Sequence, residues 1–418
     1  MSESKQSLSA SEPGTALWMS TFAFTICFAV WTIFAIIGIS ISQDLALSEA
    51  QFGLLVGTPI LTGSLVRILL GVWTGRYGGR LVYTLTMLAA ALATFLLAHA
   101  TTYPQMLLAG LGVGLAGGSF AVGVAYVSPF FPPEKQGTVL GIFGAGNVGA
   151  AVTKFLAPFV LLAWGWQAVA EIWAAVLVIT ALIFWFTTSD DPAFRDRRQR
   201  QVPQRSLAQE FAPLGSPQVW RFSLYYFFAF GGFVALSLWL PRYLVGVYGF
   251  DIAAAGMIAA CYSVPGSLFR AFGGVLSDRK GARSVMYWML GVSAVATLIL
   301  SLPVASEEGG FGITPAIFIV TVFVLGFVMS LGKAAVYKHI PAYYPDSIGA
   351  VGGIVGMVGG LGGFVLPIAF GLLKDVTGLW SSCFLLLLAI VAVALLWMHL
   401  SIRQMERRAL SLPTASAA

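Results

Sequence analysis

Two arginines lie inside apolar stretches of this chain, and each ends the same short motif. Arg67 ends the run Gly63–Arg67 (GSLVR), and Arg270 ends the run Gly266–Arg270 (GSLFR). An arginine without a partner at the centre of a bilayer costs about 2.5–3.5 kcal/mol on insertion scales. Because the chain carries this cost twice at equivalent positions, we expect both charges to serve one ligand, and that ligand should be an anion.

The stretches around these arginines are long and apolar enough to cross a membrane. Of 418 residues, 58% are hydrophobic and only 10% are charged, which excludes the ordinary soluble classes. Spanning the hydrocarbon core takes about 20 apolar residues in a helix. The sequence predicts twelve such helices, at 17–41, 51–74, 81–99, 104–128, 137–163, 167–187, 217–241, 252–276, 284–303, 313–339, 349–373 and 379–402.

The positive charges predict how these helices are oriented. Most of the 23 Lys and Arg residues fall in loops on one side of the membrane, whereas only Arg242 and Lys374 fall on the other. Loops rich in Lys and Arg stay in the cytoplasm, so both termini are predicted to be cytoplasmic. The net charge of +6 is therefore a signal of topology and not of nucleic-acid binding. We expect a multi-pass protein of the bacterial inner membrane.

A polar stretch at 189–216 divides the chain into two sets of six helices. The predicted domains are an N-terminal tail (1–16), a first bundle (17–188), this linker, a second bundle (217–402) and a C-terminal tail (403–418). Because each set has six helices, its copy begins on the same side of the membrane, and the repeats are parallel. Carriers built in this way bind their substrate near the membrane midplane, between the two halves.

The loops after the second helix of each half carry another repeated motif. Gly71–Arg80 (GVWTGRYGGR) and Gly274–Arg283 (GVLSDRKGAR) resemble the two copies of the loop motif of the major facilitator superfamily. The resemblance implies an all-α membrane protein with twelve transmembrane helices in two pseudo-symmetric six-helix bundles. It departs from the family at Gly75, where Asp is usual. It also implies a latch at the cytoplasmic side, made by Arg76, Arg80, Asp278, Arg279 and Arg283.

The charges inside the predicted spans restrict the kind of solute. Glu171 is the one carboxylate placed clearly inside a span, close to its end, whereas Arg67, Arg270, Lys154 and Lys333 are all placed centrally. This distribution is expected for an anion carrier and not for a carrier of cations. The planar guanidinium group presents paired donors to a planar oxyanion. Carboxylate, nitrate, nitrite, phosphate and sulfate all remain open on this ground.

The predicted fifth and eleventh helices are rich in glycine. Small residues allow helices to approach closely, and they also allow the backbone to approach a very small ligand. We therefore expect glycines of both helices to let the two halves move against each other around a tight site. The residues expected to do so are Gly144, Gly146, Gly149, Gly356, Gly359 and Gly360.

Several segments resemble the nitrate signatures of the nitrate/nitrite porter (NarK) family within the same superfamily. The matching segments are Gly144–Gly149 (GAGNVG), Gly349–Phe364, Gly117–Phe120 (GGSF) and Phe230–Phe233 (FGGF). The resemblance covers nearly the whole chain. It implies that nitrate binds between two arginines and contacts three further residues. Tyr225 remains an alternative to Tyr226 among these three. The residues so implied are Arg67, Arg270, Phe120, Asn147 and Tyr226.

Two modes of transport are known in that family, namely nitrate uptake with protons and exchange of nitrate for nitrite. The stretch 230–249 is more similar to the proton-coupled kind, which implies nitrate/proton symport. Lys154 and Lys333 are candidates for the coupling, because a buried lysine can give up its proton and its charge. Nitrate/nitrite antiport, a carrier of another small oxyanion, and a membrane nitrate sensor that does not transport are the alternatives.

The sequence contains no motif for enzymatic chemistry. It has no phosphate-binding loop and no Cys or His spacing typical of a metal site. We therefore expect no enzyme activity, no cofactor, no metal and no nucleic-acid partner. The expected partners are nitrate, with nitrite and protons as further ions, and membrane lipids. Carriers of this architecture usually work as monomers.

Overall fold

The computed structural model describes residues 12–132, 136–192, 194–196, 215–303, 312–343 and 348–411. These residues are almost entirely helical, and no β-strand lies among them. The first half consists of α1 (Glu12–Trp31), α2 (Phe34–Asp44), α3 (Glu49–Tyr77), α4 (Gly79–Ala98), α5 (Tyr103–Val113), α6 (Leu115–Val127), α7 (Gln136–Gly144) and α8 (Gly149–Thr187), with 3₁₀ turns at Ser128–Phe130 and Ala145–Val148. The second half consists of α11 (Pro217–Tyr226), a π-helical turn (Phe227–Gly232), α12 (Phe233–Tyr248), α13 (Ile252–Leu268), α14 (Arg270–Lys280), α15 (Ala282–Leu300), α16 (Pro315–Tyr343), α17 (Ile348–Thr377) and α18 (Ser382–Ser411).

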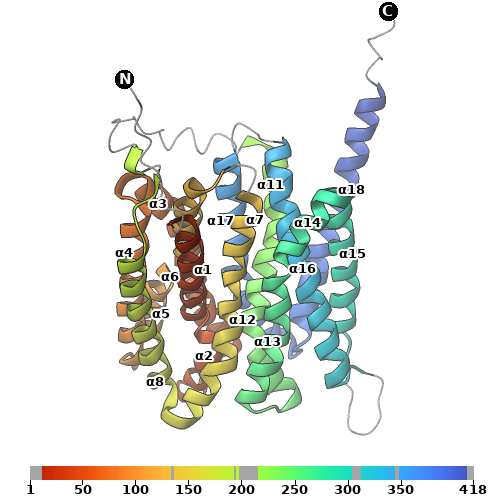
Figure 1. Ribbon diagram of the computed structural model, residues 1–418. Helices are drawn as coiled ribbons and strands as arrows, with labels where there is room; N and C mark the ends of the chain where they lie inside the picture. Colours follow the sequence, from red (N-terminus) through yellow and green to blue (C-terminus); the bar gives the residue numbers. More distant parts are fainter. Residues whose placement is uncertain are drawn as a thin grey trace, which may run out of the picture.

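The helices are long and apolar enough to cross a membrane. Ten segments of the described residues meet this condition singly, and the pair α13 and α14, bent by 44°, meets it together. One of the ten, Val139–Thr187, includes the whole of α8 and turns back at Gly165, whose φ of +85° and ψ of 170° only glycine adopts readily. Figure 1 shows the two arms of α8 rising from a bend at the lower edge of the molecule. With α8 divided there, the segments agree with the twelve spans expected from the sequence.

The halves lie side by side and meet along two pairs of helices. The first half is on the left of Figure 1 and the second on the right, with α7 and α17 near the centre. Across the boundary α3 packs along α17, and α8 packs on α13. We call the end where α8 ends and α11 begins the linker end, at the top of Figure 1, and the other end the opposite end. The all-α, two-bundle prediction is confirmed.

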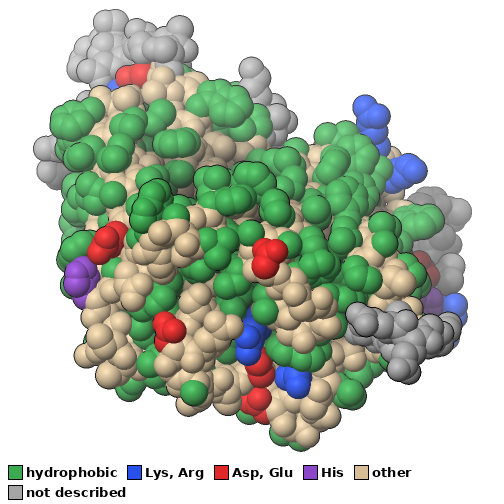
Figure 2. All heavy atoms as spheres, turned by 90° about the horizontal axis from the view of Figure 1, so that it is seen from below, with side chains coloured by type: hydrophobic (Ala, Val, Ile, Leu, Met, Phe, Trp, Pro, Cys, Tyr) green, Lys and Arg blue, Asp and Glu red, His purple; other side chains and the backbone are tan. Residues whose placement is uncertain are grey.

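The two halves are joined tightly at the opposite end. The guanidinium group of Arg242 pairs with Glu49 at 2.7 Å, and both side chains are less than one-fifth exposed. Asp375 at the end of α17 accepts hydrogen bonds from the backbone N–H of Glu49 (3.2 Å) and of Ala50 (2.9 Å). This carboxylate therefore lies at the positive N-terminus of α3 in the other half, where a negative charge is stabilising. Figure 2 views the molecule from this end, where a few acidic and basic side chains lie among apolar and neutral groups.

The contact between the halves is looser towards the linker end. At the opposite end, a Cβ added to Gly53 would come within 2.2 Å of the Pro367 carbonyl oxygen, and one at Gly371 within 2.1 Å of the Glu49 carbonyl oxygen. At the linker end, a Cβ added to Gly71 would meet no atom of the described residues within 4 Å. The structure therefore has the halves sealed against each other at the opposite end.

Three helices break at mid-depth, where the candidate site lies. The segment predicted as one helix at 137–163 is interrupted by the 3₁₀ turn Ala145–Val148. The helix predicted at 252–276 bends at Phe269, whose ψ of 4° departs from helical values. A π-helical turn, a feature frequent at functional sites, joins α11 to α12. In contrast, α3 runs through Arg67 without a break, so the two copies of the arginine motif differ in backbone.

The residues of the predicted latch find partners inside their own halves. Arg80 donates from Nε to the Trp185 carbonyl oxygen at 3.0 Å. Asp278 pairs with Lys338, and Arg283 donates to the Tyr343 hydroxyl at 2.8 Å. These contacts fix the loops to their own bundles. A latch between the halves, including the parts expected from Arg76 and Arg279, stays a prediction.

Candidate functional site

Arg67 is held by backbone from both halves. Its Nε donates to the Gly63 carbonyl oxygen of its own helix at 3.2 Å, and its Nη1 donates to the Gly356 carbonyl oxygen of α17 at 3.3 Å. Three aromatic rings surround the guanidinium carbon, those of Trp31 at 5.7 Å and of Phe120 and Phe230 at 5.6 Å. Such rings attract a cation and leave its remaining N–H groups free to bind.

Arg270 approaches the same aromatic ring from the other half. Its guanidinium carbon lies 5.9 Å from the centroid of Phe120 and 5.8 Å from that of Tyr337. The two guanidinium groups therefore cannot be further apart than the sum of their distances to Phe120. The structure thus brings together the two arginines that the repeated motif singled out, with Phe120 between the halves.

Neither arginine has a negative partner in the part of the chain that is described. No carboxylate of the described residues lies within 4 Å of either guanidinium group, and Arg270 makes no hydrogen bond with any described residue. Both side chains are partly exposed. Two like charges without compensation repel each other, and an anion between them would remove the repulsion and gain roughly 4 kcal/mol at 4 Å from each charge at an effective dielectric of 20.

Asn147 has an unused donor in the turn that follows Gly144, a glycine that lies against Arg270. It lies in the 3₁₀ turn that follows Gly144, and a Cβ added to Gly144 would be 3.5 Å from Nη1 of Arg270. Asn147 is 1% exposed, and its Nδ2 has no hydrogen-bond partner among the described residues. A buried amide donor without a partner costs about 1–3 kcal/mol, and an anion could satisfy it.

Tyr226, and not its neighbour at 225, faces the centre. Its ring stacks on Phe230 at 5.2 Å and meets Tyr337 edge-on at 5.0 Å, and both of these rings contact the arginines. The side chain of Tyr225 packs on Phe222 in another part of the bundle. Of the two tyrosines, Tyr226 is therefore the one whose ring lies beside the residues around the arginines, and its contact with nitrate stays a prediction.

The glycines singled out in the sequence lie at close approaches between helices. Gly149 is so near α1 that an added Cβ would be 2.0 Å from the Thr25 carbonyl oxygen, and one at Gly146 would be 2.5 Å from Cδ1 of Phe24. On α17, a Cβ added to Gly359 would be 2.3 Å from the Tyr226 ring. Only glycine permits these distances, which bring the helices together around the arginine pair.

Lys333 donates to the backbone carbonyl that is equivalent by sequence to the one held by Arg67. The lysine is fully buried, its Nζ donates to the Gly266 carbonyl oxygen, and it lies 3.5 Å from the Phe233 ring centroid. Gly266 is the counterpart of Gly63, whose carbonyl accepts from the side chain of Arg67. The lysine thus leaves the guanidinium group of Arg270 untied to its own helix.

Lys154 joins the two halves through uncharged oxygens. It is fully buried on α8, and its Nζ donates to the Ala150 carbonyl oxygen at 3.3 Å. The same atom bonds the hydroxyls of Ser237 and Ser263, the latter at 2.7 Å, and both serines belong to the other half. The two hydroxyls are 3.1 Å apart. No carboxylate of the described residues lies within 4 Å of this amine.

Comparison with known proteins identifies the family. The profile of the Major Facilitator Superfamily matches residues 19–306 and 247–415. A Thermus thermophilus protein named "Probable nitrate/nitrite antiporter NarK1" is 42% identical over 408 residues, and the match covers 92% of this chain and 91% of that protein. This chain belongs to the nitrate/nitrite porter family of the major facilitator superfamily.

Further relatives agree with this family, and a solved structure agrees with the fold. The nitrite extrusion protein of Bacillus subtilis is 29% identical, with 92% of this chain and 94% of that protein covered. A Staphylococcus haemolyticus protein named "Probable nitrate transporter NarT" is 31% identical, with 90% and 93% covered. The crystal structure of a bacterial homologue of the human lysosomal transporter Spinster matches with a TM-score of 0.75 at 18% identity, covering 95% of this chain and 98% of that one, and this likeness shows the fold alone.

Several residues around the arginines were not predicted from the sequence. Trp31 and Tyr337 contact the guanidinium groups, but aromatic residues are common in membrane helices and carried no signal. Ser237 and Ser263 hold Lys154, and single serines in apolar helices usually bond their own backbone. The two lysines were singled out by their charge alone, without their partners.

Gly360 permits a test of the close approach beside Arg67. A Cβ added there would be 2.4 Å from Oγ of Ser64, 3.2 Å from Cβ of Ser64 and 3.5 Å from Nη1 of Arg67. Because overpacking costs about 1–3 kcal/mol, we expect Gly360→Ala to lower the initial rate of transport in proteoliposomes by about tenfold. The Ser64 hydroxyl is buried without a partner among the described residues, so Ser64→Ala should restore much of the rate in the double variant.

Gly353→Ala is the matched control for this prediction. It lies on the same helix, and an added Cβ would meet no described atom within 4 Å. An equal loss of rate in both glycine variants, or no rescue by Ser64→Ala, would contradict the role of this contact.

Proposed function

We propose that this chain moves nitrate, and also nitrite, across the bacterial inner membrane by alternating access. The observation that carries the proposal is the pair Arg67 and Arg270, which approach one ring from opposite halves without a carboxylate partner in the described residues. The names of the relatives, which speak of nitrate/nitrite antiport, nitrite extrusion and nitrate transport, support the choice of these anions.

In this proposal the anion lies between the two guanidinium groups. Nitrate is planar and accepts paired N–H donors in its plane, which a guanidinium group supplies and an ammonium group does not. Asn147 donates from Nδ2, Tyr226 adds a further contact, and the ring of Phe120 forms a wall. A ligand bound by both halves stabilises their approach, and its release allows them to part.

The linker end faces the cytoplasm in this proposal. The excess of Lys and Arg in the loops at that end supports this orientation, since such loops are retained in the cytoplasm. The opposite end, sealed by Glu49, Arg242 and Asp375, then faces the periplasm. The described arrangement is therefore one in which nitrate is shielded from the periplasm.

Lys154 carries the coupled proton in this proposal. Its three partner oxygens satisfy an ammonium group, and either serine hydroxyl can turn and donate to the single lone pair of a neutral amine. The cage therefore accepts either protonation state. When the periplasmic end opens, the serines move away with their half, and the amine meets water and binds a proton. Nitrate and this proton then enter together.

Nitrate/nitrite antiport is the second candidate. It is favoured by the name of the Thermus thermophilus relative. It is also favoured by the arginines themselves, because two fixed positive charges need an anion in the site before the halves can close on each other. In this mode Lys154 would stay charged and only join the halves.

Flux measurements on the purified protein in proteoliposomes test the function and the mode together. Symport predicts accumulation of nitrate into empty vesicles when the outside is made acidic, with acidification of the interior. Antiport predicts uptake only into vesicles that contain nitrite, whether or not a pH gradient is imposed. Nitrite should compete with nitrate, whereas sulfate should compete at least tenfold more weakly, since it is tetrahedral and carries two charges. Nitrate bound without any flux in either mode would reject transport.

A further inference from the structure

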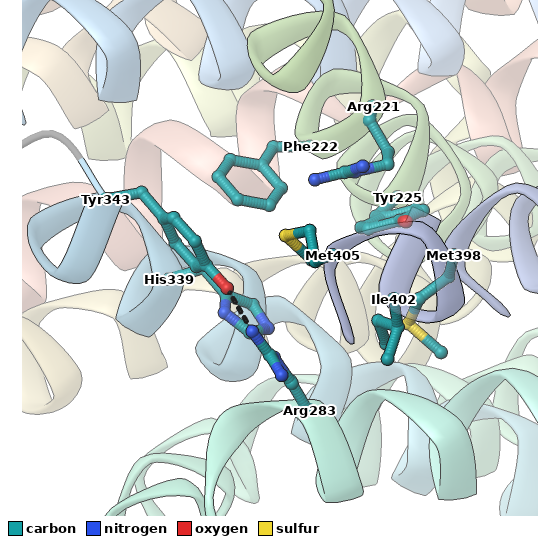
Figure 3. A pocket seen from close by; sticks show the side chains of 9 residues that line it. All are labelled: Arg221, Phe222, Tyr225, Arg283, His339, Tyr343, Met398, Ile402 and Met405. Carbon is teal, nitrogen blue, oxygen red and sulfur yellow. Dashed lines mark hydrogen bonds between the residues drawn. The ribbon is translucent and has the colours of Figure 1, made fainter. Parts of the chain in front are cut away.

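A small pocket lies inside the second half at the linker end, away from the arginine pair. It lies between α11, α15, α16 and α18 (Figure 3). Tyr226 and Tyr337 face the central arginines, whereas Tyr225 and His339 on the same two helices line this pocket. The two helices therefore separate two sites. The full lining consists of Arg221, Phe222, Tyr225, Arg283, His339, Tyr343, Met398, Ile402 and Met405.

The polar groups of this pocket are donors that lack negative partners. Arg221 packs 5.9 Å from the Phe222 ring centroid and makes no hydrogen bond or ion pair within the described residues. Arg283 enters from the facing helix and donates to the Tyr343 hydroxyl at 2.8 Å, as the dashed line in Figure 3 marks. No carboxylate is among the residues of the lining. Two guanidinium groups in one pocket are unfavourable unless an anion joins them.

Tyr225 gives an independent indication of a ligand. It is 2% exposed, and its hydroxyl has no hydrogen-bond partner in the described part of the chain. Figure 3 shows this hydroxyl in the pocket below the guanidinium group of Arg221. The cavity measures about 20 Å³, which is room for one water-sized group. One oxygen of an anionic group fits there, and the rest of the group would lie outside the cavity beside Arg283, whose side chain is exposed.

The surroundings of the pocket are those of a lipid. Met398, Ile402 and Met405 of α18 form an apolar side of the same pocket. Beyond Arg283, α15 presents an open, largely apolar face that includes Ser284, Gly291 and Val295. Trp288 on this face is 70% exposed, on a helix long and apolar enough to cross the membrane. A phosphate group in the pocket would thus have an apolar track for its acyl chain.

We propose that this pocket binds the phosphate group of an anionic phospholipid from the surrounding leaflet. One phosphate oxygen enters the pocket and accepts from the Tyr225 hydroxyl, Arg221 and Arg283 donate to the phosphate oxygens, and an acyl chain lies along the open face of α15. Basic pockets between transmembrane helices on the cytoplasmic side are known to bind anionic headgroups. The lipid would join α11 to α15 and brace the second half without entering the central site.

Native mass spectrometry of the full chain in neutral detergent tests this site. We titrate phosphatidylglycerol, with phosphatidylcholine and inorganic phosphate as comparison probes, and follow the melting temperature in parallel. The wild type should retain phosphatidylglycerol and gain thermal stability from it, with little effect of the other two. Each arginine contributes about fivefold to binding of an anionic lipid, so Arg221→Gln/Arg283→Gln should bind it at least tenfold more weakly.

Two further variants make the test decisive. Arg407→Gln removes an exposed arginine of α18 at the same end and should bind as the wild type does. Tyr225→Phe, which keeps the ring, should weaken binding even if the double arginine variant does not fold. Equal retention of phosphatidylcholine, or unchanged binding in Tyr225→Phe and the double variant, would overturn the proposal. Stabilisation by inorganic phosphate equal to that by the lipid would also overturn it, in favour of a site for free anions.

Discussion

Arg67→Lys and Arg270→Lys should each abolish nitrate uptake while the protein still reaches the membrane. A guanidinium group has five N–H donors, and Arg67 uses two of its nitrogens to hold the Gly63 and Gly356 carbonyls. A lysine at this position keeps the charge but cannot hold both carbonyls and also present a pair of donors to nitrate. Truncating one partner of a buried charged contact costs about 2–5 kcal/mol. Because both arginines are partly exposed, we expect the lower part of this range, about 2–3 kcal/mol, and a rate that falls about 100-fold.

Initial rates of nitrate uptake, normalised to the protein in the membrane, measure this effect. Arg403→Lys, an exposed position on α18, is the control and should keep its rate. Nitrate binding by the purified variants separates the clamp from a purely structural role, because a structural role would lower thermal stability and leave the affinity for nitrate unchanged. Normal flux in both clamp variants would reject the site.

The repeated motif predicted the arginine pair without a structure. An arginine inside an apolar helix is costly, and this chain has one at the same position of each half. Twelve apolar stretches and the bias of Lys and Arg predicted the spans for a similar reason, since the bilayer imposes length and charge directly on composition. The prediction that Arg67 and Arg270 face one centre followed from their equivalent positions in the two halves. These features follow from constraints that act on single residues or on single helices.

Contacts between helices distant in the sequence were not predicted. Tyr225 and Tyr226 are both aromatic and adjacent, and only the packing of Tyr226 against Gly359 shows which one faces the centre. Ser263 also bonds the Ala259 carbonyl of its own helix at 3.3 Å, which is the ordinary behaviour of serine in a membrane helix. Its second bond, to Lys154 across the boundary, depends on how two distant helices are placed.

The break of the helix at Phe269 was also not predicted from the sequence. The sequence repeats the arginine motif almost letter for letter, yet α3 is straight through Arg67 whereas the other copy bends by 44° just before Arg270. The bend accompanies a difference in partners, because the Gly266 carbonyl accepts from Lys333 and the Gly63 carbonyl accepts from Arg67. Sequence symmetry therefore located the pair but concealed that one arginine is anchored and the other is not.

Lys154→Met should uncouple nitrate flux from the pH gradient without destroying the nitrate site. The substitution removes the amine and retains an apolar chain of similar length, which suits a position that is fully buried. Accumulation of nitrate driven by an acidic exterior should fall at least tenfold, and acidification of the vesicle interior should be lost. Exchange of external nitrate for internal nitrite should continue, because both arginines remain.

Lys280→Met is the matched control, since it removes an exposed lysine at the end of α14 and should leave both modes unchanged. Ser237→Ala/Ser263→Ala keeps the amine but removes its two partners in the other half, so it should weaken coupling less than Lys154→Met does. If Lys154→Met still accumulates nitrate against its gradient, the proton does not travel on this amine. The lysine only joins the halves if two results are found. Wild-type flux would already require internal nitrite, and Lys154→Met would lower nitrate uptake by the same factor with and without a pH gradient. The buried amine thus distinguishes a carrier driven by protons from one that moves only when each anion is replaced by another.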